Sequence, residues 1–158
     1  MARVDMMQTL EGFGEAFRVG RVRTEPVRGK ENFVRHEDHP QGGTPRMTYA
    51  RTKGAHVTAV AVFVIGDPYE GLACVQIGYA VREDQRGKGI ATELATGALA
   101  DFTSYLANRG MRKFALESTV DRDNPASRAV SIALLGVDPE EKDSDGVPVW
   151  HFIKVIET

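Results

Sequence analysis

Two glycines and two cations follow one another in the stretch Arg86-Gly87-Lys88-Gly89. An apolar run with a period of two precedes this stretch, which is typical of a half-buried strand, and a helical apolar pattern starts at Ile90. A turn from strand to helix brings together unpaired backbone N–H groups and the positive end of the helix dipole. Glycines let a phosphate approach the backbone closely. The stretch therefore predicts an anion site.

Three phosphate-binding patterns can be compared with this stretch. The P-loop requires Ser or Thr after its lysine, but Gly89 follows Lys88. The dinucleotide fingerprint requires a third glycine where Thr92 stands. The pattern [QR]-x-x-G-x-[GA] is met by Arg86-Gly87-Lys88-Gly89-Ile90-Ala91. This segment resembles the acyl-CoA pyrophosphate loop of the GNAT N-acetyltransferase superfamily.

The flanking sequence strengthens the resemblance. I-G-Y-A-V-R-E-D-Q-R-G-K-G-I-A-T-E-L and, further on, L-E-S-T-V-D-R-D-N-P-A-S-R-A-V-S-I-A-L-L-G-V are similar to successive blocks of the branch that acetylates N-termini of ribosomal proteins. The two blocks cover roughly the second half of the chain, in the order and spacing of that branch. The resemblance implies an α/β fold with a mixed central sheet, two splayed parallel strands and flanking helices.

The resemblance also implies where acetyl-CoA would bind. Backbone groups from Tyr79 to Val81 would pair with the pantetheine arm, and backbone N–H groups of the glycine loop would hold the pyrophosphate. Asn124 and Ser127 match the N-x-x-S of the second block, whose side chains approach the cofactor. The implied cofactor-binding residues are Tyr79, Val81, Arg86, Gly87, Lys88, Gly89, Ile90, Ala91, Asn124 and Ser127.

Acetyl transfer to an amine requires removal of a proton from the amine and stabilisation of the departing thiolate. Glu117 is the leading candidate for the base, although the related enzymes carry their glutamate at the position of Thr119, two residues later on the same strand face. Many relatives also carry a tyrosine as the acid where this chain has Ser131. We expect Ser127 or Tyr79 to take the place of that tyrosine. Glu93, His56 and His151 are further titratable candidates for proton transfer, and each is expected to have a structural role instead.

Length and composition indicate one globular domain over residues 1–158, with 42% hydrophobic and 27% charged residues. The net charge of −2 gives no reason to expect nucleic acid, and no apolar run is long enough to cross a membrane. The single cysteine, Cys74, falls inside an expected strand, so we expect it to be a packing residue. Because it cannot form an internal disulfide, a reducing cytoplasm is expected. His36 and His39 lack a supporting ligand cluster, so we expect no metal.

Strands are expected at 46–51, 56–65, 74–81, 113–120 and 147–157, and helices at 5–19, 90–108 and 125–135. Gly110 and Gly136 are expected to end the second and third helices, and Asn124 to begin the third. Residues 20–45 are interpreted as loops with room for a short strand or helical turn, and residues 138–146 as a loop. The helix at 90–108 connects two strands as a crossover, so the strands at 74–81 and 113–120 should be parallel neighbours.

The sequence thus favours an N-acetyltransferase that moves an acetyl group from acetyl-CoA to a primary amine by direct attack. The alternative is a non-catalytic acyl-CoA-binding regulatory domain, which the serine at position 131 favours. The acceptor is expected to be a small-molecule amine or a protein N-terminus, and a homodimer is left open. No nucleic-acid or membrane partner is expected.

Overall fold

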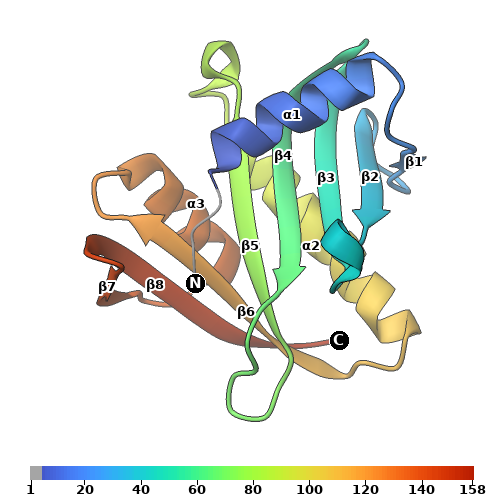
Figure 1. Ribbon diagram of the computed structural model, residues 1–158. Coiled ribbons are helices and arrows are strands. Elements are labelled where there is room, and N and C mark those ends of the chain that lie inside the picture. The colour runs from blue at the N-terminus through green and yellow to red at the C-terminus, as the bar shows by residue number, and fades with distance from the viewer. Residues whose placement is uncertain (1–4) are drawn as a thin grey trace.

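The computed structural model describes residues 5–158 and contains one eight-stranded mixed sheet in the order β1-β2-β3-β4-β5-β6-β8-β7 (Figure 1). All neighbouring strands are antiparallel except β5 and β6. The strands are β1 (Glu25–Pro26), β2 (Phe33–Asp38), β3 (Arg46–Lys53), β4 (His56–Ile65), β5 (Cys74–Val81), β6 (Lys113–Asp121), β7 (Glu140–Ser144) and β8 (Val147–Glu157).

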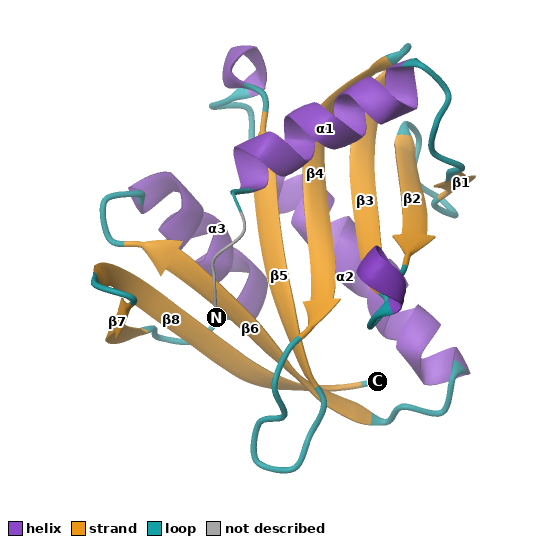
Figure 2. Cartoon of the chain, in the orientation of Figure 1, coloured by secondary structure: helices purple, strands orange, loops and turns teal. Residues whose placement is uncertain are grey.

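Three α-helices cover the two faces of this sheet (Figure 2). Helix α1 (Met6–Arg18) lies on one face and buries Leu10 against β4 and β5. The Asp5 carboxylate begins this helix by accepting hydrogen bonds from the backbone N–H groups of Met7 and Gln8. The helix places Met6 so close to Gly78 that a Cβ there would meet the Met6 sulfur at 2.6 Å. Gly78 therefore allows α1 to approach β5.

Helix α2 (Ile90–Asn108) packs on the opposite face and supplies most of the main core. Its buried stripe includes Leu94, Ala98 and Phe102, at the spacing of one helical face. The Phe102 ring stacks on Phe63 of β4 with 4.5 Å between centroids. This stacking holds the second half of α2 against β4.

Helix α3 (Pro125–Leu135) lies on the same face as α2, behind β6 (Figure 1). The Asn124 side chain accepts a hydrogen bond from the Ser127 N–H, and Gly136 ends the helix in the left-handed conformation with φ 63°. Arg128 places its guanidinium 4.7 Å from the centre of the Trp150 ring on β8, which ties the helix to that strand.

The parallel pair β5–β6 is short. It contains only the partners Cys74–Ala115, Val75–Leu116 and Gln76–Glu117. Beyond them β5 continues along β4 as far as Val81, and β6 continues along β8 as far as Asp121. Figure 1 shows the two strands separating from this point upward, with α3 behind the opening. The five residues of β5 that do not pair with β6, residues 77–81, make this opening roughly 16 Å long at about 3.3 Å per residue.

The expected bounds of β4, β5, β8, α2 and α3 are confirmed, as are the parallel neighbours β5 and β6. The expectation of a loop was wrong at residues 140–144, whereas residues 20–45 contain the short strand that was left open. Residues 33–38 form β2, where the charged side chains are accommodated because Arg35 binds Asp101 of α2 at 2.7 Å. Residues 140–144 form β7, an exposed edge strand that joins β8 through Asp145-Gly146, both with positive φ.

Candidate active site

The free edge of β5 faces the opening between the parallel strands. The N–H of Arg82 donates to Thr58 O on β4, so even-numbered residues at this end of β5 direct their backbone groups toward β4. Tyr79 and Val81 therefore direct theirs into the opening. Arg86 Nε donates to Val81 O at 3.2 Å, which agrees with this direction. The opening thus presents backbone groups that an extended ligand could pair with.

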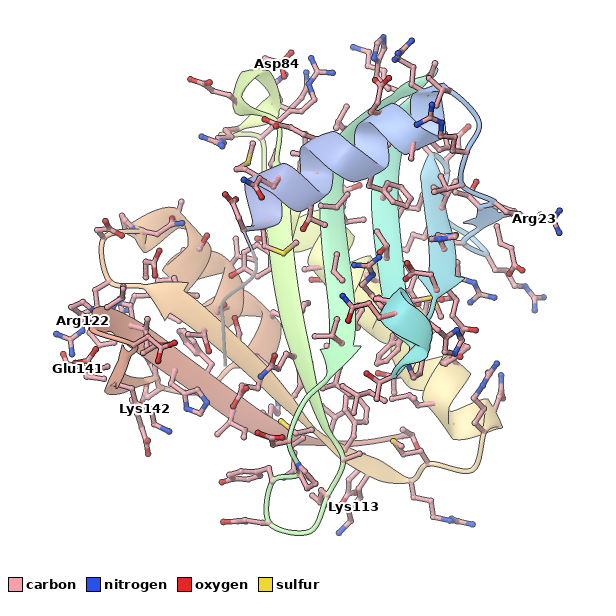
Figure 3. The ribbon with its side chains drawn as sticks, viewed as in Figure 1. Arg23, Asp84, Lys113, Arg122, Glu141 and Lys142 are labelled. Carbon is pink, nitrogen blue, oxygen red and sulfur yellow. The ribbon has the colours of Figure 1, made fainter. Side chains whose placement is uncertain are left out.

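The glycine loop lies at the upper end of this edge, after the short 3-10 helix η2 (Glu83–Gln85), where Figure 3 labels Asp84. Gly87 and Gly89 have φ values of 78° and 73°, and a Cβ added to either would meet no atom within 4 Å. This conformation favours glycine, and the open space leaves room for a ligand.

The start of α2 has no side-chain cap. Gly89 is the N-cap residue, and the first intrahelical bond runs from Glu93 N to Gly89 O. The N–H groups of Ile90 and Ala91 therefore point out of the helix without an intrahelical acceptor. Lys88 is exposed beside them. The backbone groups expected for phosphate binding are gathered here, whereas the Arg86 guanidinium is turned back toward β5, with one nitrogen 3.4 Å from Met7 Sδ.

A chain of hydroxyl groups crosses the rear of the opening. Tyr79 Oη donates to the carbonyl oxygen of Ser127 at 2.6 Å and lies 2.7 Å from Ser131 Oγ. Ser131 Oγ lies 2.8 Å from Ser118 Oγ. Because the Tyr79 proton goes to a carbonyl, one consistent arrangement has Ser118 donating to Ser131 and Ser131 donating to Tyr79. The chain links β5, β6 and α3 where the strands are no longer paired.

Tyr79 and Ser127, the two residues expected to provide the acid, have different surroundings. Burial raises the pKa of Tyr79 above its ordinary value, against the lowering effect of its hydroxyl contacts, so the phenol stays protonated at neutral pH. Ser127 contacts Tyr79 through its carbonyl, and its N–H is bound by Asn124 Oδ1 at 3.1 Å. Of the two hydroxyls expected to serve as the acid, Tyr79 is the one that extends across the opening.

Ser131 is fully buried, and this leads to a prediction about the tyrosine that relatives carry there. Its Oγ already lies at hydrogen-bond distance from Tyr79 and Ser118, so a second ring has no space. We expect Ser131→Tyr to lower the free energy of unfolding by about 1–3 kcal/mol through overpacking. Urea denaturation would measure the change, and Ser127→Ala at the same helix would be a milder control. An unchanged midpoint would show that α3 can move to admit the ring.

Glu117 lies on the other side of the sheet, at the last paired position of β6. Its Oε1 accepts from Gln76 Nε2 at 2.8 Å, and its Oε2 lies 2.7 Å from His151 Nε2. The side chain is 21% exposed. The hydrogen bond from His151 lowers the pKa of Glu117 below 4.5 in spite of burial, and Gln76 lowers it further. Glu117 is therefore an ionised carboxylate at the point where the strands separate.

Sequence reasoning missed Gln76 and Ser118 and gave His151 only a structural role. Gln76 and Ser118 lie in correctly predicted strands, one beside Glu117 in register and the other next to it along β6. The crossover topology predicts that β5 and β6 are parallel neighbours, but the register that pairs Gln76 with Glu117 comes from the structure. His151 reaches Glu117 because β8 pairs with β6, a pairing that the sequence did not indicate.

Two other expectations concern a thiol and a metal. Cys74 is buried, and burial raises its pKa to about 11, so it is a packing residue as expected. His36 belongs to β2 and donates through Nδ1 to Arg23 O at 2.7 Å. Within residues 5–158, no group of three His, Cys, Asp or Glu side chains is arranged to hold a metal ion. No helix in the same range is long and apolar enough to cross a bilayer.

Solved structures show the same fold. A ribosomal-protein-S5-alanine acetyltransferase from Vibrio fischeri is 10% identical with a TM-score of 0.59, over 84% of this chain and 96% of that one. A ribosomal-protein-alanine N-acetyltransferase from Brucella melitensis is 20% identical with a TM-score of 0.51, over 74% and 72%. The yncA protein of Salmonella typhimurium, solved with acetyl-CoA, is 16% identical with a TM-score of 0.51, over 75% and 66%.

These solved structures share the fold of this chain. The family model described as "Acetyltransferase (GNAT) domain" matches residues 20–134, well over half of the chain. The chain therefore belongs to the GNAT acetyltransferase family and is an acetyl-CoA-dependent acyltransferase. No curated protein matches the sequence.

Proposed function

We propose that this protein transfers an acetyl group from acetyl-CoA to the nitrogen of a primary amine by direct attack. One arrangement carries the proposal. The free edge of β5 leads from an uncapped two-glycine helix start at one end to an ionised carboxylate, Glu117, at the other. An extended anionic ligand fits the first part, and a proton acceptor stands where its far end would reach.

The residues of the opening fit the acyl donor in two ways. Backbone groups of Tyr79 and Val81 would pair with its amide-containing arm, once Arg86 leaves Val81 O. Backbone N–H groups from Arg86 to Ala91 would hold its pyrophosphate, because both glycines leave open space and no side chain caps the helix. Arg86 and Lys88 would add charge near the phosphates.

The chemical step follows from the position of Glu117. The amine lone pair attacks the thioester carbonyl carbon, a C–N bond forms and the C–S bond breaks. A free alkylammonium has a pKa of about 10.4. The lowered pKa of Glu117 makes this carboxylate too weak a base to deprotonate the free ammonium. Glu117 therefore acts after the neutral amine has begun to bond, when the nitrogen becomes positively charged and strongly acidic.

The sulfur leaves as a thiolate or thiol, and Tyr79 is proposed to assist it. A thiol has a pKa of about 8.5, so the thiolate is a tolerable leaving group that gains from one hydrogen bond. The raised pKa of Tyr79 makes its hydroxyl a hydrogen-bond donor more than a full acid. Its proton must turn from the Ser127 carbonyl toward the sulfur, and Ser127 Oγ is the second candidate for this role.

The remaining assignments concern context. We propose that residues 1–158 form one catalytic domain, supported by the single sheet that includes strands from β1 to β8. A reducing cytoplasm suits the unpaired thiol of Cys74. The acceptor is proposed to be a small-molecule amine or a protein N-terminus, as the names of the similar alanine acetyltransferases suggest. A homodimer is compatible with this site.

One observation favours a non-catalytic acyl-CoA-binding domain as the second candidate. The hydroxyl nearest the opening, Tyr79, already donates to a main-chain carbonyl, and position 131 is a serine. The two functions are separated by incubating the protein with acetyl-CoA and a panel of amines and peptides, with mass spectrometry of the products. We expect one acceptor class to gain an acetyl group. CoA binding by calorimetry without any acetylated product would favour the binding domain.

A further inference from the structure

Glu117 is held at both oxygens by side chains from neighbouring strands. Gln76 of β5 binds Oε1 and His151 of β8 binds Oε2. A carboxylate has about four lone-pair positions, so two remain for another donor. The carboxylate is therefore fixed in rotation about its last bond, and its unused positions are left for a ligand at the opening.

His151 is an unexpected residue on its strand face. On this face of β8, the residues two positions before and after His151 are Val149 and Ile153, both β-branched and apolar. Val147 and Val155 continue the apolar pattern, which ends at Glu157, the last residue of the strand. His151 lies opposite Thr119 in the register with β6 and opposite Glu140 in the register with β7, and its side chain is only 12% exposed. Another valine or isoleucine would continue the pattern.

The ring of His151 is anchored by one nitrogen only. Its Nδ1 is buried and has no hydrogen-bond partner among residues 5–158. The ionised Glu117 can only accept, so Nε2 carries the proton that it donates. A buried polar atom without a partner destabilises a fold. The placement of a histidine here is thus unfavourable for folding and is explained by what Nε2 does to Glu117.

We propose that His151 is a positioning residue that orients the Glu117 carboxylate toward the acceptor amine. The inference rests on the proposed function, in which Glu117 is the base. His151 donates through Nε2 and so fixes which Glu117 lone pairs face the opening, while Gln76 performs the same task from the other side. Lys142 of β7 adds a weaker attraction on the carboxylate, and Figure 3 shows this residue at the outer edge of the sheet.

Two amide substitutions test this role, because they differ by one methylene. The amide nitrogen of His151→Gln can reach the position of Nε2 and donate to Glu117, whereas that of His151→Asn ends one bond short. We expect His151→Gln to keep kcat within about fivefold of wild type. We expect His151→Asn to lower kcat by about 10- to 100-fold, with the KM for acetyl-CoA unchanged, because the chemical step depends on geometry.

A second readout does not depend on turnover. The pH titration of the Glu117 carboxyl carbon, followed by ¹³C NMR, should give a value below 4.5 in wild type and in His151→Gln. In His151→Asn it should move upward, because the largest lowering contact is gone. Equal kcat values for wild type and His151→Asn, or equal titrations, would overturn the inference. No turnover by wild type with any amine would overturn the proposed function, and the inference with it.

Discussion

Gly89→Glu is expected to weaken CoA binding by at least about 100-fold while leaving the protein folded. Gly89 is the N-cap residue of α2, a 19-residue helix that starts after β5 without a side-chain cap. The substitution places a side chain and a negative charge where phosphate must approach the backbone N–H groups. Isothermal titration with CoA would measure the loss.

The fold should tolerate this change. A Cβ at Gly89 would meet no atom within 4 Å, so only the left-handed conformation, with φ 73°, opposes it. That strain costs about 1–2 kcal/mol. A carboxylate beside the first turn of α2 offsets about 0.3–1 kcal/mol of this through the helix dipole. The net change in the free energy of unfolding is therefore small compared with the change in binding.

Gly110→Glu is the matched control. Gly110 follows the other end of α2, has φ 84° and also has no atom within 4 Å of its would-be Cβ. The same side chain is thus introduced with similar backbone strain, far from the opening. We expect Gly110→Glu to lower the melting temperature slightly and to bind CoA like wild type. Equal affinities for the two variants would remove the glycine loop from the binding site.

The elements that sequence reasoning found are those with a strong local signal. The apolar run of β4 and the capped ends of α3 need no tertiary information, because Asn124 and Gly136 mark both ends of that helix. β7 consists of charged and polar residues, so hydrophobic periodicity could not find it. Its hairpin signal was present in Asp145-Gly146, which directly precedes the strand that was found.

The candidate site divides in the same way. The glycine loop is contiguous in sequence, so its pattern alone indicated the anion site. The contacts of Glu117 join three strands that are far apart in the chain, and they depend on β8 lying next to β6. The serine chain of Ser118, Ser131 and Tyr79 likewise depends on the packing of α3 behind the opening. Such groups are visible only once the register is known.

Glu117→Gln is expected to lower kcat/KM for the amine by about 10²- to 10³-fold, the range of general base catalysis. The variant should fold, because the new amide can accept from His151 Nε2 and donate to Gln76 once the Gln76 amide is turned over. Glu140→Gln is the control, since it removes an exposed carboxylate from the adjacent edge strand, opposite His151 in register. It should leave the rate and CoA binding unchanged.

The pH dependence sharpens this prediction. The pKa of Glu117 is lowered below 4.5, mainly by the hydrogen bond from His151, so its charge is constant between pH 6 and 9. As a group with a depressed pKa, it stabilises the fold above the unfolded value, and this contribution is lost only as the pH falls through the folded value. We therefore expect any rise of kcat/KM between pH 6 and 9 to come from deprotonation of the amine. Wild type and Glu117→Gln should give parallel profiles across this range, separated by the loss in rate. A profile that flattens in Glu117→Gln would show that the Glu117 carboxylate titrates near neutral pH, against the geometry that holds it ionised.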